Sequence, residues 1–235
     1  MLNKALKVKF QKNKKKVTVS VAPANYKIEQ EMRVEYAKQY RAAMKMGVST
    51  RPSMLELMRK EKIWTSEQEE ELTELTIHAA LLEAALVEQT EEHNIERQKE
   101  LVMELTRIRA KVYELVSIKT LPLEHTCEQL AEDSQLDYYV ASCTVDENGA
   151  KYFRNVDDFR QRRKESDSEA IFTAVLQELS KDNVELLRQL PEHQWLMSND
   201  YMDKNGNLLQ KELEEGLLAE AGMTADVEEM LKKDD

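Results

Sequence analysis

The chain has 235 residues, a net charge of −11, two cysteines, and only 5 glycines and 4 prolines. This length supports one large domain or two small ones, and few helix breakers beside 34% charged residues indicate a mainly helical fold. No apolar stretch follows the N-terminal lysines, and the most apolar run, 78–87, contains Glu83. We therefore expect neither a signal peptide nor a membrane-spanning helix.

The charge is distributed unevenly along the chain. Residues 1–63 contain 16 Lys and Arg against 5 Asp and Glu, whereas residues 64–235 contain 18 against 40. This asymmetry predicts a basic contact region on an acidic protein. It also allows attraction within the chain or association between copies as a homo-oligomer, and the sequence does not choose between them.

The N-terminal segment predicts a β-hairpin. Apolar and polar side chains alternate in 6–10 and again in 17–21, as in half-buried strands, and the lysine-rich stretch 11–16 joins them. The lysines are interpreted as a solvated tip, and the alternative is contact with phosphate groups. That alternative is disfavoured because the acidic remainder would repel nucleic acid. The candidate phosphate contacts are Lys12, Lys14, Lys15 and Lys16.

Two helices and a capping motif should follow the hairpin. Apolar residues recur at helical spacing from about Asn25, and Gly47 suits the end of that helix. Thr50 is placed to cap a second, short helix. Residues 65–68, "TSEQ", form a capping box that starts a third. Trp64, directly before it, is interpreted as a packing anchor rather than a ligand-stacking residue.

Residues 66–118 carry two leucine-rich stripes that do not share one helical register. Between them, 88–94 is a run of seven polar residues. This pattern favours a central antiparallel helical hairpin over one continuous helix, which stays the alternative. The domains expected from these patterns are 1–63 (basic β-hairpin and two helices), 64–121 (helical hairpin), 122–222 (mixed, mostly helical) and 223–235 (charged tail).

Within 122–222, we expect a helix near 123–133 and a buried helix passing into a strand over 136–145. Short helices should cover 155–166 and 167–180. A less regular stretch should begin at Pro191.

The residues do not form a recognisable catalytic, cofactor-binding or metal-binding constellation. His125 and Cys127 are candidate zinc ligands two positions apart, and Cys143 could be a third, but a structural site needs four. Cys127 and Cys143 are interpreted as reduced, buried thiols. The "DKNGN" segment, 203–207, lacks the glycine position of a calcium loop and indicates a plain turn. We therefore expect no enzyme activity, no cofactor and no metal.

The order of these segments resembles the tail assembly chaperones of tailed bacteriophages. The most specific parts are "KEKIWTSEQEEEL" (60–72) and "SCTVDENGAKYF" (142–153), and a late "DKNGNLL" turn (203–209) follows them. The resemblance implies a non-enzymatic protein in the cytoplasm of an infected bacterium. It would keep an apolar, helical tape-measure protein soluble while tail-tube subunits assemble.

Within this hypothesis the partner-binding residues are expected to be apolar and to lie near the start of the helical hairpin. The predicted contacts are Met54, Leu57, Met58 and Trp64. Two other functions stay open: a structural virion protein of the tail or baseplate, and a nucleic-acid-binding regulator acting through the lysine hairpin.

Overall fold

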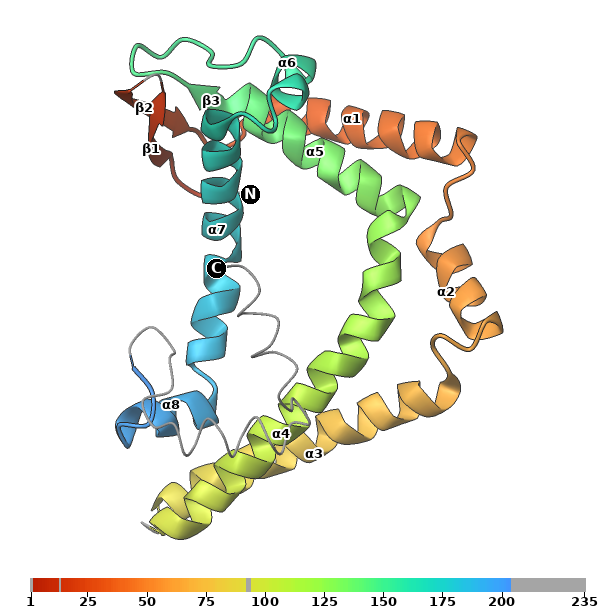
Figure 1. Ribbon diagram of the computed structural model, residues 1–235, viewed down its shortest axis with the longest axis vertical. Coiled ribbons are helices and arrows are strands. Elements are labelled where there is room, and N and C mark those ends of the chain that lie inside the picture. Colours follow the sequence, from red (N-terminus) through yellow and green to blue (C-terminus); the bar gives the residue numbers. More distant parts are fainter. Residues whose placement is uncertain (1, 13, 92–93, 204–235) are drawn as a thin grey trace, which may run out of the picture. The chain divides into compact units, whose positions relative to one another are not determined.

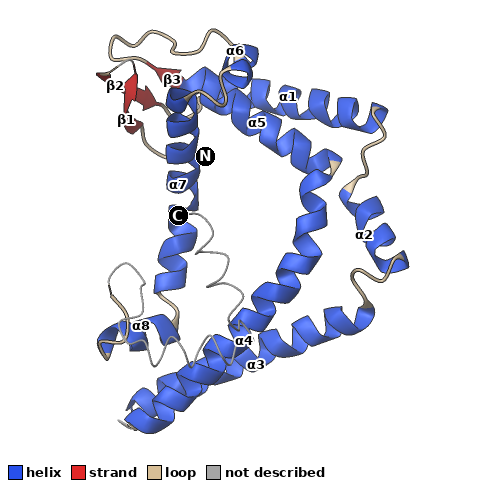
Figure 2. Cartoon of the chain, viewed as in Figure 1, coloured by secondary structure: helices blue, strands red, loops and turns tan. Residues whose placement is uncertain are grey.

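The computed structural model describes residues 2–12, 14–91 and 94–203, without the side chains of 90, 91 and 182–184. Helices dominate these residues and the strands are few and short (Figure 2). The predicted class, mainly α with a small N-terminal β-hairpin, is therefore confirmed. The elements in chain order are β1 (Leu6–Lys12), β2 (Lys15–Val21), α1 (Tyr26–Lys45), α2 (Arg51–Lys60), α3 (Ser66–Glu91), α4 (Ile95–Thr120), the 3-10 helix η1 (Leu121–His125), α5 (Cys127–Cys143), β3 (Thr144–Val145), α6 (Val156–Gln161), α7 (Ser166–Arg188) and α8 (Pro191–Ser198).

Contacts group these elements into two compact units. Within the described residues, the first combines 2–57 with 122–184, and the second combines 58–121 with 185–203. The four ranges expected from the sequence follow the chain, whereas each unit joins segments that are distant in sequence. The reason is that 122–184 packs on the N-terminal hairpin and α1, while α8 packs on α3 and α4.

In the first unit, β1 and β2 pair in an antiparallel register from Leu6 opposite Val21 to Lys12 opposite Lys15. The strands are thus longer than 6–10 and 17–21, and the stretch 11–16 belongs mostly to the ladder rather than to a loop. The expected joining segment was too long because pairing continues through polar residues as far as the turn. The strand expected at the end of 136–145 is β3, and it adds to β2 as a third antiparallel strand, a pairing that the sequence did not predict.

The core of this unit lies between the sheet, α1, α5, α6 and α7. Val8, Val19 and Val21 supply the sheet's apolar face, as the alternation predicts, and Phe153 and Phe159 are fully buried beside them. Figure 1 shows α1 and α5 lying side by side, with the sheet at one end of the pair. The Tyr139 hydroxyl of α5 donates to the Ala22 carbonyl at 3.0 Å, which connects this helix to the segment directly after β2.

The predicted helix ends are found in the structure. The Asn25 side chain accepts from the Ile28 amide at the start of α1, and Gly47 has the left-handed φ of 81° that ends it. At the start of α3, the Thr65 amide donates to Gln68 at 2.9 Å, and the Gln68 amide donates to the Thr65 hydroxyl at 3.3 Å. These reciprocal bonds form the expected capping box.

The second unit contains the helical hairpin, and the prediction that 66–118 folds back on itself is confirmed. α3 and α4 pack against each other next to the turn that joins them and separate toward the start of α3 (Figure 1). Ala79, Leu82 and Leu86 of α3 meet Leu101 and Leu105 of α4 in one buried cluster. These residues belong to the two leucine stripes, so the change of register marks the turn between the arms.

The prediction of an irregular stretch after Pro191 is wrong, because residues 191–198 form α8. Pro191 starts this helix rather than interrupting it, since a proline in the first turn lacks only an amide hydrogen that needs no helical partner. Trp195 and Leu196 of α8 are buried against the hairpin. The "DKNGN" turn and the 223–235 tail lie outside the described residues, apart from Asp203.

Candidate functional site

A groove of about 1180 Å³ follows one side of the helical hairpin. Its apolar wall includes Leu75 of α3 and Ile108 and Ile118 of α4, and Leu121 continues it onto η1. Tyr113 and Leu121 are 75% and 58% exposed. Large apolar side chains so open to solvent are typical of a surface that meets a partner.

Polar residues, most of them charged, edge this groove. Glu71 and His78 contribute from α3, and Arg107, Lys111 and Glu114 contribute from α4. His78 Nε2 lies 3.5 Å from Glu104 Oε1, so a polar contact connects the two arms beside the groove. An apolar floor with mixed polar edges suits an amphipathic helix, whose apolar face enters while its polar face stays hydrated.

Helix α8 packs on both arms of the same hairpin, nearer to the turn that joins them. Trp195 donates its indole N–H to Gln98 Oε1, and the Gln98 amide group donates to the Gln89 carbonyl at 2.7 Å. Arg109 of α4 pairs with Glu83 of α3 and with Glu192 of α8. Glu192 is 2% exposed, and its Oε2 atom is buried without a hydrogen-bond partner. Its buried charge therefore depends on Arg109.

The four predicted partner contacts differ in their exposure to solvent. Met58 and Trp64 are each 1% exposed, Met54 is half-buried, and Leu57 is 44% exposed. Only Leu57 thus presents a large apolar surface to solvent. The partner-binding role of the set stays a prediction, and in this structure Trp64 lies in the interior as the anchor interpretation expects.

Trp64 is held by polar contacts at its edge and face. Its indole N–H donates to Glu69 Oε2 at 2.7 Å, and the Lys119 ammonium lies 5.3 Å from its ring centre. Lys119 also pairs with Glu69 at 2.8 Å. The salt bridge and the hydrogen bond from Trp64 lower the pKa of Glu69. These contacts connect the start of α3 to the end of α4.

The lysine cluster divides into one paired and three exposed residues. Lys12 Nζ lies 2.5 Å from Asp167 Oδ2, at the start of α7, and it also contacts the Tyr152 hydroxyl. Lys14, Lys15 and Lys16 are exposed. Lys12 therefore serves a tertiary contact, which its neighbours in sequence did not reveal. Phosphate contact through the remaining lysines stays a prediction.

Asp167 is 1% exposed and carries a strongly shifted pKa. Burial alone would raise this pKa, but hydrogen bonds from Lys12 and Tyr152 outweigh it and lower the value from 3.8 to about 2. Arg162 adds a contact at 2.7 Å. The carboxylate therefore stays ionised. It connects α7 to β1 through Lys12, and to the segment after β3 through Tyr152.

Because the folded-state pKa of Asp167 is depressed, its contribution to stability is present above about pH 4 and is lost as pH falls towards 2. Lys12 is 38% exposed, which screens the pair, so we expect about 1–2 kcal/mol from this carboxylate. Asp167→Asn should lower the free energy of unfolding at pH 7. It should also reduce the further loss of stability that occurs as pH falls from 4 to 2. Urea unfolding followed by circular dichroism at several pH values measures both effects, and an unchanged slope in the variant would contradict the assignment.

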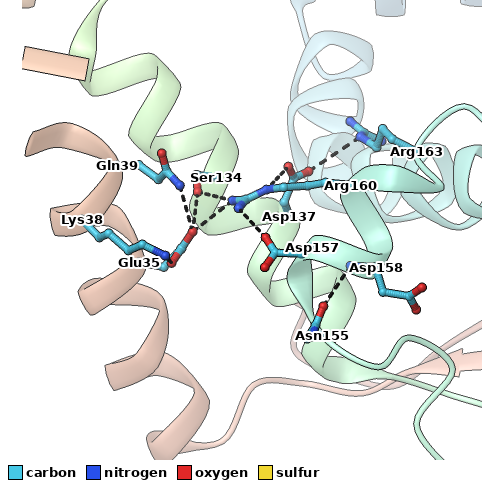
Figure 3. Close-up of polar contacts among 10 residues, drawn as sticks. All are labelled: Glu35, Lys38, Gln39, Ser134, Asp137, Asn155, Asp157, Asp158, Arg160 and Arg163. Carbon is cyan, nitrogen blue, oxygen red and sulfur yellow. Dashed lines mark hydrogen bonds and ion pairs between the residues drawn. The ribbon is translucent and has the colours of Figure 1, made fainter. Parts of the chain in front are cut away.

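A second polar cluster fastens α6 to α1 and α5 (Figure 3). Arg160 of α6 extends to Glu35 of α1 at 3.1 Å and to Asp137 of α5 at 3.4 Å. Ser134 donates to Glu35 at 3.0 Å and accepts from Arg160. Arg163 lies 3.7 Å from the other Asp137 oxygen.

The two carboxylates of this cluster have pKa values shifted in opposite directions. Burial acts to raise the pKa of Glu35, but hydrogen bonds from Gln39, Arg160 and Ser134 lower it overall. For Asp137, burial raises the pKa, and Arg163 and Arg160 offset only part of the effect. Since the groups pair with one another, we interpret the cluster as a structural clamp.

The two cysteines stand at opposite ends of α5, both buried and free. They are sixteen positions apart on the helix, which corresponds to about 24 Å, so they cannot share a metal ion with His125. Burial raises the pKa of both thiols, for Cys143 to about 11. This agrees with the prediction of buried thiols. In the described ranges, no three His, Cys, Asp or Glu side chains gather as a metal site requires.

The sequence interpretation missed the groove because it assigned the helical stripes of 66–118 to the core. A second series with alternating spacings of four and three runs along α4, beside the buried leucines. Its members are Arg107, Lys111, Glu114, Ile118 and Leu121. The change from charged to apolar residues along this series is a signal that could have predicted a partly exposed face.

None of the described helices combines the length and hydropathy needed to cross a membrane. Comparison with protein-family models gives no match, and comparisons with curated proteins and with solved structures give none either.

Proposed function

We propose that this protein is a non-enzymatic assembly factor that holds an amphipathic helix of a client protein in the α3–α4 groove. The observation that carries the proposal is the groove itself, with its apolar wall of Leu75, Ile108 and Ile118 and its exposed Tyr113. A helix-in-groove contact uses apolar anchors spaced by three and four residues, and this groove runs along two helices that offer the matching surface.

The client is a tail protein of a bacteriophage, such as the tape measure or the tail tube, and the protein acts in the cytoplasm of the infected cell. Two features support this proposal: the order of segments that resembles tail assembly chaperones, and a net charge of −11 that would keep an apolar client in solution.

Site-specific photo-crosslinking during phage production tests the proposal. A photoreactive benzoylphenylalanine at Tyr113 should crosslink to a helical segment of a tail protein, because this residue lies in the groove. The same group at Val87, which is 53% exposed and does not line the groove, is the matched control and should give no such product. Mass spectrometry identifies the crosslinked peptides.

Two outcomes would contradict the proposal. Equal products at Tyr113 and Val87, or none above background at Tyr113, would mean that the groove is not the client site. A fixed copy number in purified particles would instead identify a structural protein of the tail or baseplate, and quantitative mass spectrometry of particles and lysate measures it.

A further inference from the structure

One face of α1 is largely exposed and carries both cations and apolar side chains. Val34 and Met44 on this face are 68% and 53% exposed. The opposite face is buried on α5 through Met32, Glu35 and Ala43. The series on the exposed side has alternating spacings of three and four residues. Its members are Lys27, Gln30, Val34, Ala37, Arg41 and Met44.

One face of α3 is exposed, apolar at its centre and acidic at its ends. Ile77 and Leu81 are 56% and 64% exposed, and they point away from Ala79 and Leu82, which pack on α4. The series on this face has alternating spacings of four and three residues. Its members are Glu70, Glu74, Ile77, Leu81, Ala84 and Glu88. α3 contains no Lys or Arg anywhere in its sequence.

We propose that the exposed face of α3 in one copy packs antiparallel against the exposed face of α1 in a second copy. Alternating spacings of three and four residues place side chains in a straight line along a helix, as two packed helices require. The two series have similar lengths, about 26 Å from Lys27 to Met44 and about 27 Å from Glu70 to Glu88.

One antiparallel register satisfies both the apolar and the charged residues. When Val34 lies opposite Leu81, Arg41 lies opposite Glu74 and Lys27 lies opposite Glu88. In the same register Lys45 lies opposite Glu70, and Ala37 lies beside Ile77. The apolar centres thus meet each other, and each acidic end of the α3 series meets a cation of α1.

The charge pattern favours a second copy of this chain as the partner of the exposed α1 face. A basic and apolar face needs an acidic and apolar partner, and every copy of the chain carries both at equal concentration. Nucleic acid would satisfy the cations of α1 but would leave Val34, at the centre of this face, without an apolar partner. One helix pair is a small interface, so the association is weak and reversible. This inference does not depend on the proposed groove function.

Sedimentation velocity of the full chain over a concentration range tests the inference. The mean mass should rise above that of a monomer with concentration, and more strongly at low salt, because the contact pairs opposite charges. Lys27→Glu with Arg41→Glu should raise the dissociation constant about tenfold or more, and Glu74→Lys with Glu88→Lys should do the same.

An apolar variant tests the centre of the contact separately. Ile77→Ser with Leu81→Ser should also weaken association, although it leaves the net charge unchanged. Because both side chains are exposed, these changes should leave the fold of the monomer intact. Undiminished association of this variant would contradict the proposed packing of the two faces.

Mixing the two charge variants is the decisive experiment. Each variant alone has like charges at the facing positions of α1 and α3, whereas the mixture again contains a basic α1 and an acidic α3 and should associate. Both variants remain negatively charged overall, so net attraction cannot explain the recovery. Loss of folding cannot explain it either, because mixing does not refold a chain.

Lys14→Glu with Lys15→Glu is the matched control. It makes the same charge change as the α1 variant, at exposed residues near the tip of the β-hairpin, and should leave association intact. A chain that is monomeric at every concentration and salt would overturn the inference. So would a control that loses association as fully as the α1 variant, or a mixture that stays dissociated.

Discussion

Replacing Arg109 by Met is expected to lower the free energy of unfolding of the second unit by about 3 kcal/mol or more. The reason is the position of Glu192, whose side chain is 3% exposed and pairs with Arg109. Its second oxygen already lacks a hydrogen-bond partner. Without the guanidinium, a buried carboxylate would keep its desolvation cost and lose its counter-charge. Both tryptophans, Trp64 and Trp195, belong to this unit, so denaturant unfolding followed by tryptophan fluorescence measures the effect.

Two further variants separate the charge from the side chain's bulk. Arg109→Met combined with Glu192→Leu removes both charges and should recover most of the loss, since apolar replacement of a buried pair is often neutral. Arg107→Met changes an exposed arginine on the same helix and should shift stability by no more than about 0.5 kcal/mol. If Arg109→Met behaved like Arg107→Met, the buried-pair explanation would be wrong.

Trp64→Ala is expected to cost about 3–5 kcal/mol, because it empties the space of a large side chain that is 1% exposed. The change also removes the donor to Glu69 and the ring beneath Lys119, so it loosens the contact between the ends of α3 and α4. Trp195 fluorescence reports the unfolding of this variant. Trp64→Phe keeps most of the apolar volume and should lose only about 1–2 kcal/mol.

The same experiment distinguishes the two interpretations of Trp64. Leu57→Ser, at the exposed member of the predicted contact set, should change stability little. If Trp64→Ala were equally mild and instead abolished client crosslinking, Trp64 would be a partner contact rather than an anchor.

Features that depend on residues a few positions apart could be predicted from the sequence. The alternation of Val17, Val19 and Val21 predicts a strand with one buried face, and the reciprocal hydrogen bonds of Thr65 and Gln68 follow from their spacing. The change of register between the leucine stripes predicts the folded-back hairpin for a similar reason. In each case the local pattern and the tertiary structure favour the same conformation.

Which surfaces meet, and which remain open, was decided by contacts between distant segments. Arg160 and Glu35 are 125 positions apart, Lys12 and Asp167 are 155 apart, and Trp195 and Gln98 are 97 apart. The residues near each of these positions in sequence do not identify its partner. A polar side chain has the same neighbours in sequence whether it pairs with a distant residue or faces solvent. The helical hairpin, the capping box of α3 and the uneven charge were thus determined by the sequence itself. The burial of Trp64, the pairing of Lys12 and the open groove of the hairpin were decided only by tertiary packing, because side-chain exposure depends on every element that surrounds it.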